Sequence, residues 1–229
     1  MFEQVSILLP FKTDNGIRHA VLQWVIRFYY KIMPGVEICV GENFDESFNK
    51  CKAINAAARK ATRNVYVLAD CDVIYDPDLI VEALHLLQQE KAPWVIPFNR
   101  ALDISKEKTE KLIQREPEWP LPSIEAHCQE GFMAPMFAGK INIFSREAFE
   151  NVGGFDERFV GWGGEDDAFC FAMNTLCGPF TRLNRTIYHL WHPFAGHSNP
   201  HFHANMEIKN SYQRAYGDQE AMKRLIRNN

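Results

Sequence analysis

The first hundred residues alternate short apolar runs with segments whose apolar residues recur every three or four positions. The apolar runs predict buried strands, and the spaced residues predict amphipathic helices. Because runs without polar alternation are typical of strands covered on both faces, we expect parallel strands with right-handed crossovers. The predicted strands are 5–9, 36–40, 65–68 and 94–98, and the predicted helices are 19–30, 47–61 and 77–89.

Prolines mark two of these boundaries. Pro10 is expected to stop the first strand, because proline has no N–H to offer a sheet ladder. Asp76 followed by Pro77 predicts an N-cap and the first residue of a helix.

The second half of the chain is less regular. The segment 99–131 is charged and broken by prolines, and we predict a partly helical excursion rather than sheet. The tail is rich in His and Asn, and we expect it to be a mobile lid that orders over substrate. Between the segment 99–131 and the tail, the pattern predicts strands at 134–138, 141–144 and 186–190 and helices at 146–151 and 165–175.

Composition narrows the class of protein. The chain has 229 residues, of which 46% are hydrophobic and 24% charged, as in a soluble protein with one large domain. A net charge of −4 without a Lys/Arg-rich run argues against a nucleic-acid partner. No apolar run approaches the ~20 residues that span a bilayer, and the start lacks the basic residues of a signal peptide, so we expect a cytoplasmic protein. The six scattered cysteines are expected to be reduced.

Two aspartates follow the third predicted strand. Asp70 and Asp72 are two residues apart, so their side chains should point to the same side at the carboxyl edge of the sheet, where open α/β sheets bind ligands. Paired carboxylates repel each other unless a cation lies near them, and their oxygens suit Mg²⁺ or Mn²⁺ bound to a diphosphate. The alternative is that both are loop residues and that only Asp76 has a role, as a helix cap.

A second acidic cluster, 165–167, follows a glycine-rich turn at 161–164. The plain interpretation is that these carboxylates occupy the first turn of a helix, where the helix dipole favours negative charge. Because helical residues are about 100° apart around the axis, at most two of the three can face one pocket, and one there can act as a general base. Trp162 either offers a flat face to a sugar ring or packs in the core.

His189 and His192 lie at the end of the last predicted strand. In a straight strand this spacing points the two imidazoles to opposite faces, so both reach one metal ion only if the chain bends, which Pro193 favours. Each histidine is otherwise an ordinary polar residue at a strand end. Three more histidines follow in the tail, at His197, His201 and His203.

Four sequence blocks carry a resemblance to a known family. They are Pro10-Phe11-Lys12, Phe48-Asn49-Lys50, Asp70-Cys71-Asp72 and Gly-Trp-Gly-Gly-Glu-Asp-Asp at 161–167. In order and in content they resemble the β-1,4-galactosyltransferase group of GT-A fold glycosyltransferases, with its C-terminal galactosyltransferase-type module. The last block is highly specific.

The resemblance implies a single α/β domain of GT-A fold over 1–229, with a Rossmann-like, mostly parallel central sheet and helices on both faces. Within it, the implied parts are a nucleotide-sugar half at 1–100, an acceptor and catalytic half at 131–207, and a lid and tail at 193–229.

The resemblance also implies roles for individual residues. Asp166 would be the catalytic base. Mn²⁺, or Mg²⁺, would be held by Asp72, His189 and His192. The nucleotide would be contacted by Pro10, Phe11, Lys12, Glu42, Phe48, Lys50, Asp70 and Cys71. The sugars would lie near Trp162, Gly164, Glu165, Asp167, Met136 and Gly139.

Several positions depart from the family pattern. Lysines replace arginines at 12 and 50, which loses bidentate phosphate geometry. His189 stands where the family has a methionine ligand, and an imidazole is the better ligand for Mn²⁺. Met136 stands where galactose-specific enzymes carry a tyrosine, which would leave room for an N-acetylhexosamine donor.

The implied activity is metal-dependent, inverting transfer of a hexose or N-acetylhexosamine from a UDP-sugar to an acceptor hydroxyl. The acceptor stays open between a glycan, a lipid-linked intermediate and a protein. The alternatives are a retaining N-acetylgalactosaminyltransferase-like enzyme, a nucleotidyltransferase and a non-catalytic carbohydrate-binding module.

Overall fold

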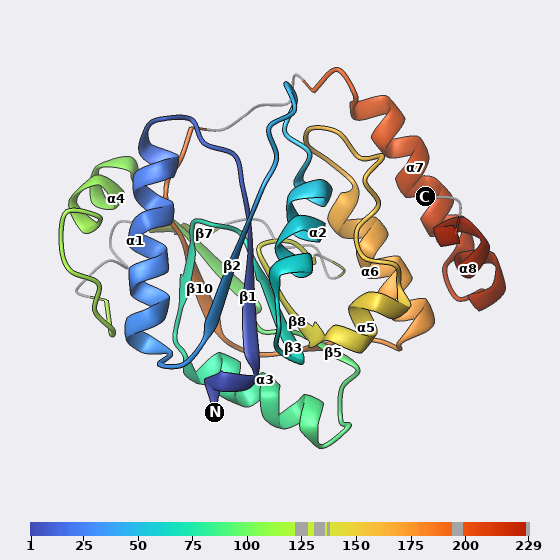
Figure 1. Cartoon of the computed structure of the whole chain (residues 1–229), viewed down its shortest axis with the longest axis horizontal. Helices are drawn as coiled ribbons and strands as arrows, with labels where there is room; N and C mark the ends of the chain where they lie inside the picture. The colour runs from blue at the N-terminus through green and yellow to red at the C-terminus, as the bar shows by residue number, and fades with distance from the viewer. Residues whose placement is uncertain (122–127, 131–135, 137, 194–198, 228–229) are drawn as a thin grey trace.

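The main sheet is a layer of mostly parallel strands with helices on both faces (Figure 1). The structure is a computed structural model that describes residues 1–121, 128–130, 136, 138–193 and 199–227. The strand order is β2-β1-β3-β8-β5-β9, and within it only β8 runs against the others. The strands are β1 (Val5–Phe11), β2 (Glu37–Glu42), β3 (Val65–Ala69), β5 (Trp94–Ile96), β8 (Ile141–Ser145) and β9 (Thr181–Arg182).

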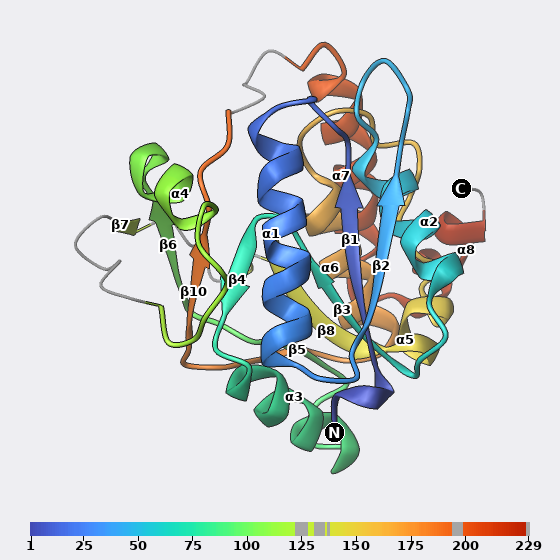
Figure 2. The same ribbon diagram turned by 60° about the vertical axis from the view of Figure 1, so that its left-hand side comes forward.

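The helices of this layer follow the predicted pattern. The crossovers from β1 to β2 and from β2 to β3 place α1 and α2 on opposite sides of the sheet (Figure 1). In Figure 2 β1 and β2 point upward, so their carboxyl ends lie at the upper edge of the molecule. The helices are α1 (Ile17–Ile32), α2 (Lys50–Lys60), α3 (Asp78–Gln88), α5 (Arg146–Asn151) and α6 (Glu165–Leu176), with a 3₁₀ turn at Phe2–Gln4.

Burial confirms the interpretation of the apolar runs. Every residue of β1 and β3 is buried, as expected for strands covered on both faces. The helix after Asp76 forms one residue later than predicted, with Pro77 as its N-cap residue, and the Asp76 carboxylate accepts a hydrogen bond of 2.9 Å from the Asp78 N–H. Pro10 does not end β1, which continues to Phe11. It lies beyond Leu8, the last residue of β1 paired with β3, so there is no ladder on that side for proline to interrupt.

A second, smaller sheet overturns the prediction for 99–131. That segment was expected to avoid sheet structure, yet it contributes two strands and a helix, α4 (Lys106–Leu112). The polar residues of the short strand β6 conceal it, and its neighbour β10 comes from a distant part of the chain. The sheet has the order β4-β10-β6-β7, formed by β4 (Val73–Tyr75), β10 (Thr186–His189), β6 (Arg100–Ile104) and β7 (Cys128–Glu130).

The tail is largely helical, which the sequence pattern did not predict. It contains α7 (Phe202–Ala215) and α8 (Gln219–Arg227), which pack against each other and against α6. Tyr212 and Met222 are buried by this packing, which explains why the segment is helical. No described helix is long and apolar enough to cross a membrane. The predicted strand at 134–138 lies largely outside the described residues, and Ala138 is not in a strand.

A carboxylate stabilises the main sheet at the amino ends of β1 and β2. Glu37 accepts hydrogen bonds from the Ser6 hydroxyl and, at 2.7 Å each, from the N–H and the hydroxyl of Thr62. Burial raises the pKa of Glu37, but these hydrogen bonds outweigh it and lower the pKa to about 2.

Replacing Glu37 by alanine should lower the free energy of unfolding by about 1–3 kcal/mol at pH 7, because three hydrogen bonds to an ionised group are lost. The stabilisation is present above pH 4.5, the ordinary pKa of the group, and is lost as the pH falls toward 2. Urea titrations of the wild type and of Glu37→Ala should therefore show a difference in the free energy of unfolding that is smaller at pH 3.5 than at pH 7. The exposed Glu116, replaced by alanine, is the control. An equal difference at both pH values contradicts the assignment.

Candidate active site

Three candidate metal ligands meet where the two sheets join. Asp72 is buried between β3 and β4, and His189 and His192 come from the end of β10. The Nε2 atom of His189 lies 3.2 Å from Asp72 Oδ1, and the Nε2 atom of His192 lies 3.3 Å from Oδ2. The two rings are nearly perpendicular, with 88° between their planes. The chain therefore bends after β10, and this bend allows both imidazoles to face one point.

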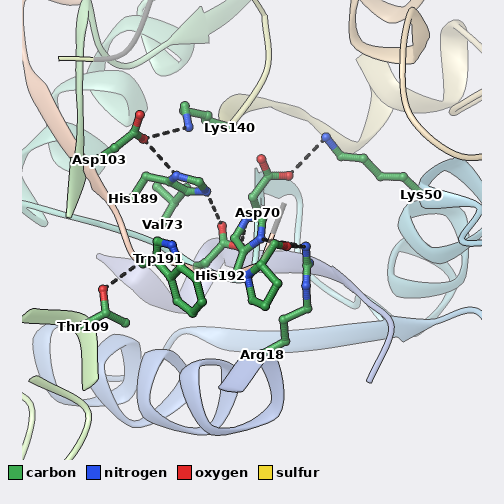
Figure 3. A network of polar contacts seen from close by, with 12 residues as sticks. Arg18, Lys50, Asp70, Val73, Asp103, Thr109, Lys140, His189, Trp191 and His192 are labelled. Carbon is green, nitrogen blue, oxygen red and sulfur yellow. Dashed lines mark hydrogen bonds and ion pairs between the residues drawn. The ribbon is translucent and has the colours of Figure 1, made fainter. Parts of the chain in front are cut away.

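Two backbone hydrogen bonds hold this bend. The N–H of Leu190 donates to the carbonyl of Asp72 at 2.8 Å. The N–H of Trp191 donates to the hydroxyl of Thr109, a buried residue of α4, at 2.9 Å (Figure 3). The α4 segment of the small sheet thus helps to set the direction of the two imidazoles.

The cluster fits a divalent cation. One ligand atom from each of Asp72, His189 and His192 can be chosen so that all lie within 4.8 Å of one another. The Oδ1 atom of Asp72 is buried, and its contact with His189 Nε2 at 3.2 Å lacks the geometry of a hydrogen bond. A buried carboxylate oxygen requires compensating positive charge, which a bound cation would supply. One carboxylate with two imidazoles suits Mn²⁺ or a related transition metal better than Mg²⁺, which prefers oxygen ligands.

The carboxylate and the two imidazoles of this cluster shift one another's pKa values. Burial raises the pKa of Asp72, but His189 and His192 outweigh burial and hold it well below its usual range. Burial lowers the pKa of His189, yet Asp72 and Asp103 raise it to about 9. Burial lowers the pKa of His192. At neutral pH His189 is therefore the protonated partner of Asp72, and a metal ligand must lose that proton.

Metal affinity should consequently rise with pH. Below pH 9 each ion that binds displaces one proton from His189, so the dissociation constant for Mn²⁺ should fall by about tenfold per pH unit. Isothermal titration with MnCl₂ between pH 6.5 and 8.5, in buffers of different ionisation enthalpy, measures both the affinity and the proton released. An affinity independent of pH would contradict the proton–metal exchange.

Lys50 connects the two acidic segments. Its ammonium lies 3.1 Å from Asp70, 3.2 Å from Asp166 and 3.9 Å from Glu165. Burial lowers the pKa of Lys50, but the three carboxylates hold it well above its ordinary value. Figure 3 shows the Lys50 side chain reaching toward Asp70 beside the histidine cluster. The structure thus places Lys50, predicted to contact the nucleotide, between the carboxylates of both motifs.

Asparagines of α2 explain how the glycine turn comes to lie beside Lys50. Asn49 caps α2 by accepting from the Lys52 N–H at 2.9 Å and donates to the carbonyl of Glu157 at 2.7 Å. Asn55 exchanges two hydrogen bonds with the backbone of Phe155. These long-range contacts bring the segment before the turn onto the start of α2.

Of the three carboxylates after the glycines, Glu165 and Asp166 lie near Lys50 and Asp167 is directed to solvent, in keeping with the expectation that at most two can face one pocket. Gly164 has φ +90°, a left-handed conformation that side chains disfavour, and it begins α6. Glu165 is buried and accepts a 3.0 Å hydrogen bond from the Gly163 N–H, and Asp166 faces Lys50. Asp167 is exposed.

Asp166 has the electrostatic character of a base. Burial raises its pKa to about 7, Lys50 opposes the rise, and Glu165 and Asp70 reinforce it. Both of its carboxylate oxygens lie 3.2 Å from Lys50 Nζ, which fixes their orientation. A carboxylate with this pKa can accept a proton efficiently near neutral pH.

Trp162 is not a core residue. It is 47% exposed and stacks on Phe202 of α7, with ring centroids 6.1 Å apart. Sequence reasoning missed the residues that hold its backbone. The Asn199 amide donates to the carbonyls of Val160 and Trp162, and the buried Asn205 exchanges hydrogen bonds with Val160. Nothing in the local pattern of the tail indicated these contacts.

The remaining predicted site residues keep their assigned roles as predictions. Lys12 donates hydrogen bonds to the carbonyls of Asp45 and Glu46, at 2.6 and 2.7 Å, and so connects the end of β1 to the loop after β2. Around it, Pro10 and Phe11 are buried, Glu42 is exposed at the end of β2, Phe48 is half-buried, Cys71 is buried, Gly139 is buried before β8 and Met136 is an exposed turn residue. His197 lies outside the described residues.

Two further residues of the cluster were also missed. Asp103 Oδ1 lies 3.0 Å from His189 Nδ1, and Arg18 Nη2 lies 2.7 Å from His192 Nδ1 (Figure 3). Each belongs to an element whose position depends on the tertiary fold, so no sequence signal pointed to it.

Two protein-family models match parts of this chain. Residues 37–153, just over half of the chain, match the model described as glycosyl transferase family 2. Residues 122–194 match the model described as the N-terminal domain of galactosyltransferase. Both describe glycosyltransferases, which confirms the predicted class of enzyme and the resemblance seen in the sequence.

One curated relative is N-acetylgalactosaminyltransferase 6 of Drosophila melanogaster, 28% identical over 134 residues, or 54% of this chain. The chain spans only 20% of the length of that protein.

Two solved structures share the fold. The catalytic domain of Drosophila β1,4-galactosyltransferase 7, in complex with xylobiose, has a TM-score of 0.55 at 18% identity, covering 90% of this chain and 79% of that one. TarS 1–349 of S. aureus, in complex with UDP-GlcNAc, has a TM-score of 0.58 at 10% identity, covering 97% and 70%. These likenesses confirm the predicted GT-A fold class.

Proposed function

The chain belongs to glycosyl transferase family 2, and on that premise we propose that it transfers a hexose or N-acetylhexosamine from a UDP-sugar to an acceptor hydroxyl, with inversion and with a divalent metal. The observation that carries the proposal is one polar assembly in which Lys50 joins Asp70, next to the candidate metal ligands, to the half-buried candidate base Asp166. Leaving group and attacking hydroxyl would lie at its two ends.

The donor would lie across the carboxyl ends of the first strands. Asp72, His189 and His192 are the residues that would hold the metal. When bound there, a divalent ion would stabilise the charge of the departing diphosphate, so that no protein acid is required. A UDP-linked donor is supported by the fold shared with TarS, whose structure contains UDP-GlcNAc.

Asp166 would take the proton of the acceptor. The acceptor oxygen would form a bond to the anomeric carbon as the bond from that carbon to the diphosphate breaks, and the hydroxyl proton would pass to the Asp166 carboxylate. Attack on the face opposite the leaving group inverts the configuration. Lys50 would keep the carboxylate oriented, because it contacts both of its oxygens. The exposed face of Trp162 would support the acceptor sugar.

Asp166→Asn should lower kcat by about 10²–10⁴-fold while donor binding persists, because an amide cannot accept the proton. The wild-type rate should rise toward pH 7 and then level, since only the ionised carboxylate acts as base. Transfer assays measure the rate, and thermal stabilisation by UDP-sugar with Mn²⁺ measures donor binding. Asp218→Asn, which keeps the hydrogen bond to the Ala221 N–H at the start of α8, is the control. Near-normal turnover of Asp166→Asn would reject the assignment.

A second candidate is a retaining N-acetylgalactosaminyltransferase-like reaction. It is favoured by the 28% identity to N-acetylgalactosaminyltransferase 6 over 134 residues. In that reaction Asp166 would not be the base toward the acceptor, so the two candidates differ in stereochemistry as well as in donor.

Product stereochemistry distinguishes them. With UDP-Gal, UDP-GlcNAc and UDP-GalNAc each offered to a panel of aryl glycosides, the anomeric proton coupling in the NMR spectrum of the product should show inversion. A product with the configuration of the donor would replace the inverting proposal with the retaining one.

A further inference from the structure

The small sheet places a carboxylate beside one of the two candidate metal-binding imidazoles. β10 lies between β4 and β6, and its register pairs His189 with Val73 on one side and Asp103 on the other. Residues paired across neighbouring strands project from the same face, so the two side chains must meet. The Asp103 Oδ1 atom lies 3.0 Å from His189 Nδ1 (Figure 3).

This contact determines which nitrogen of His189 is available. An ionised carboxylate only accepts hydrogen bonds, so Nδ1 must carry the proton that it shares with Asp103. The other nitrogen, Nε2, points at the Asp72 carboxylate, 3.2 Å away, and carries the second proton while the ring is charged. If a metal ion displaces that proton, the hydrogen bond to Asp103 keeps Nδ1 protonated, and the lone pair of Nε2 is then directed into the candidate metal site.

Asp103 is itself held in place. Lys140 Nζ lies 3.7 Å from the same Oδ1 atom. Lys140 has φ +71°, an unusual conformation for a residue with a side chain, and its carbonyl accepts a 2.8 Å hydrogen bond from the Asp70 N–H. One residue thus connects the backbone of the acidic pair to the carboxylate behind His189.

His192 has a different environment. Its Nδ1 lies 2.7 Å from the Arg18 guanidinium, which only donates, and 2.9 Å from the Pro193 carbonyl, which only accepts. These two contacts favour opposite tautomers and assign neither one to His192. Of the two rings, His189 is therefore the one whose Nδ1 contact directs metal binding to Nε2.

We propose that Asp103 is a positioning residue of the metal centre, which fixes the ring orientation and tautomer of His189 for coordination through Nε2. The proposal rests on the metal-dependent function proposed above and adds a residue from a strand that the sequence did not reveal. A carboxylate behind a ligating imidazole raises metal affinity by about 10–100-fold in comparable sites.

The decisive experiment is a double-mutant cycle with Mn²⁺ alone as the probe. Asp103→Ala should weaken Mn²⁺ binding by about 10–100-fold in isothermal titration. In a His189→Met background the same substitution should have almost no effect, because a thioether has no N–H to orient. The effect on Mg²⁺ binding should be smaller than on Mn²⁺ binding, since Mg²⁺ relies on oxygen ligands.

The controls separate orientation from charge and from folding. Glu130→Ala removes a carboxylate from the same small sheet, where it pairs with Arg100, and should leave Mn²⁺ affinity unchanged. Asp103→Asn keeps an oxygen that can accept from Nδ1–H, so its affinity should lie between those of wild type and Asp103→Ala. Circular dichroism and thermal melting establish that each variant is folded.

The possible results are distinct. Unchanged Mn²⁺ affinity in Asp103→Ala would overturn this inference and leave the proposed function intact. An equal loss in the wild-type and His189→Met backgrounds would also overturn it, because Asp103 would then act through its charge. Failure of the wild-type protein to bind Mn²⁺ would remove both this inference and the metal-dependent function.

Discussion

A buried carboxylate at the join of the two sheets is the constraint on which the site depends. Asp72 is 5% exposed, and a charge in such surroundings must be paired or bound to a cation. His189 and His192 supply the pairing, and they reach it because the chain bends after β10. That bend is held by a hydrogen bond to the backbone carbonyl of Asp72 and by one to the Thr109 hydroxyl. The small sheet and α4 therefore help to place the two imidazoles beside the Asp72 carboxylate.

Lys50 offsets part of the negative charge of three neighbouring carboxylates. It is one half-buried cation among the carboxylates of Asp70, Glu165 and Asp166, which leaves an excess of negative charge at the carboxyl edge of the sheet. The excess explains why burial prevails at Asp166 and its pKa rises although an ammonium lies in contact. The same excess makes the region receptive to a cation. One lysine thus connects the carboxylates of the two acidic motifs.

The glycine turn and the tail form the third part of the site. Left-handed backbone at Gly163 and Gly164 allows α6 to begin at Glu165, directly after the glycines, so the carboxylates lie on its first turn. The turn is not self-supporting, because Asn199 and Asn205 carry its backbone hydrogen bonds. The C-terminal helices are consequently part of the architecture of the site, which explains why they pack on α6 instead of remaining irregular.

Local pattern was sufficient for most of the main sheet and for the residues that meet at its edge. Apolar runs identified β1, β2, β3, β5 and β8, and helical spacing identified α1, α2 and α3, because burial on two faces and helical packing leave a direct imprint on neighbouring residues. The short strands β4 and β9 were missed. Local pattern could not identify the β6–β10 pairing, where a short, partly polar strand finds its partner some ninety residues away, as in the pairing of Asp103 with His189. Nor could it identify that Lys50 lies between Asp70 and Asp166 or that distant asparagines carry the glycine turn. Such contacts are decided only when the whole chain has folded, since long-range pairing leaves no periodic signal in either partner.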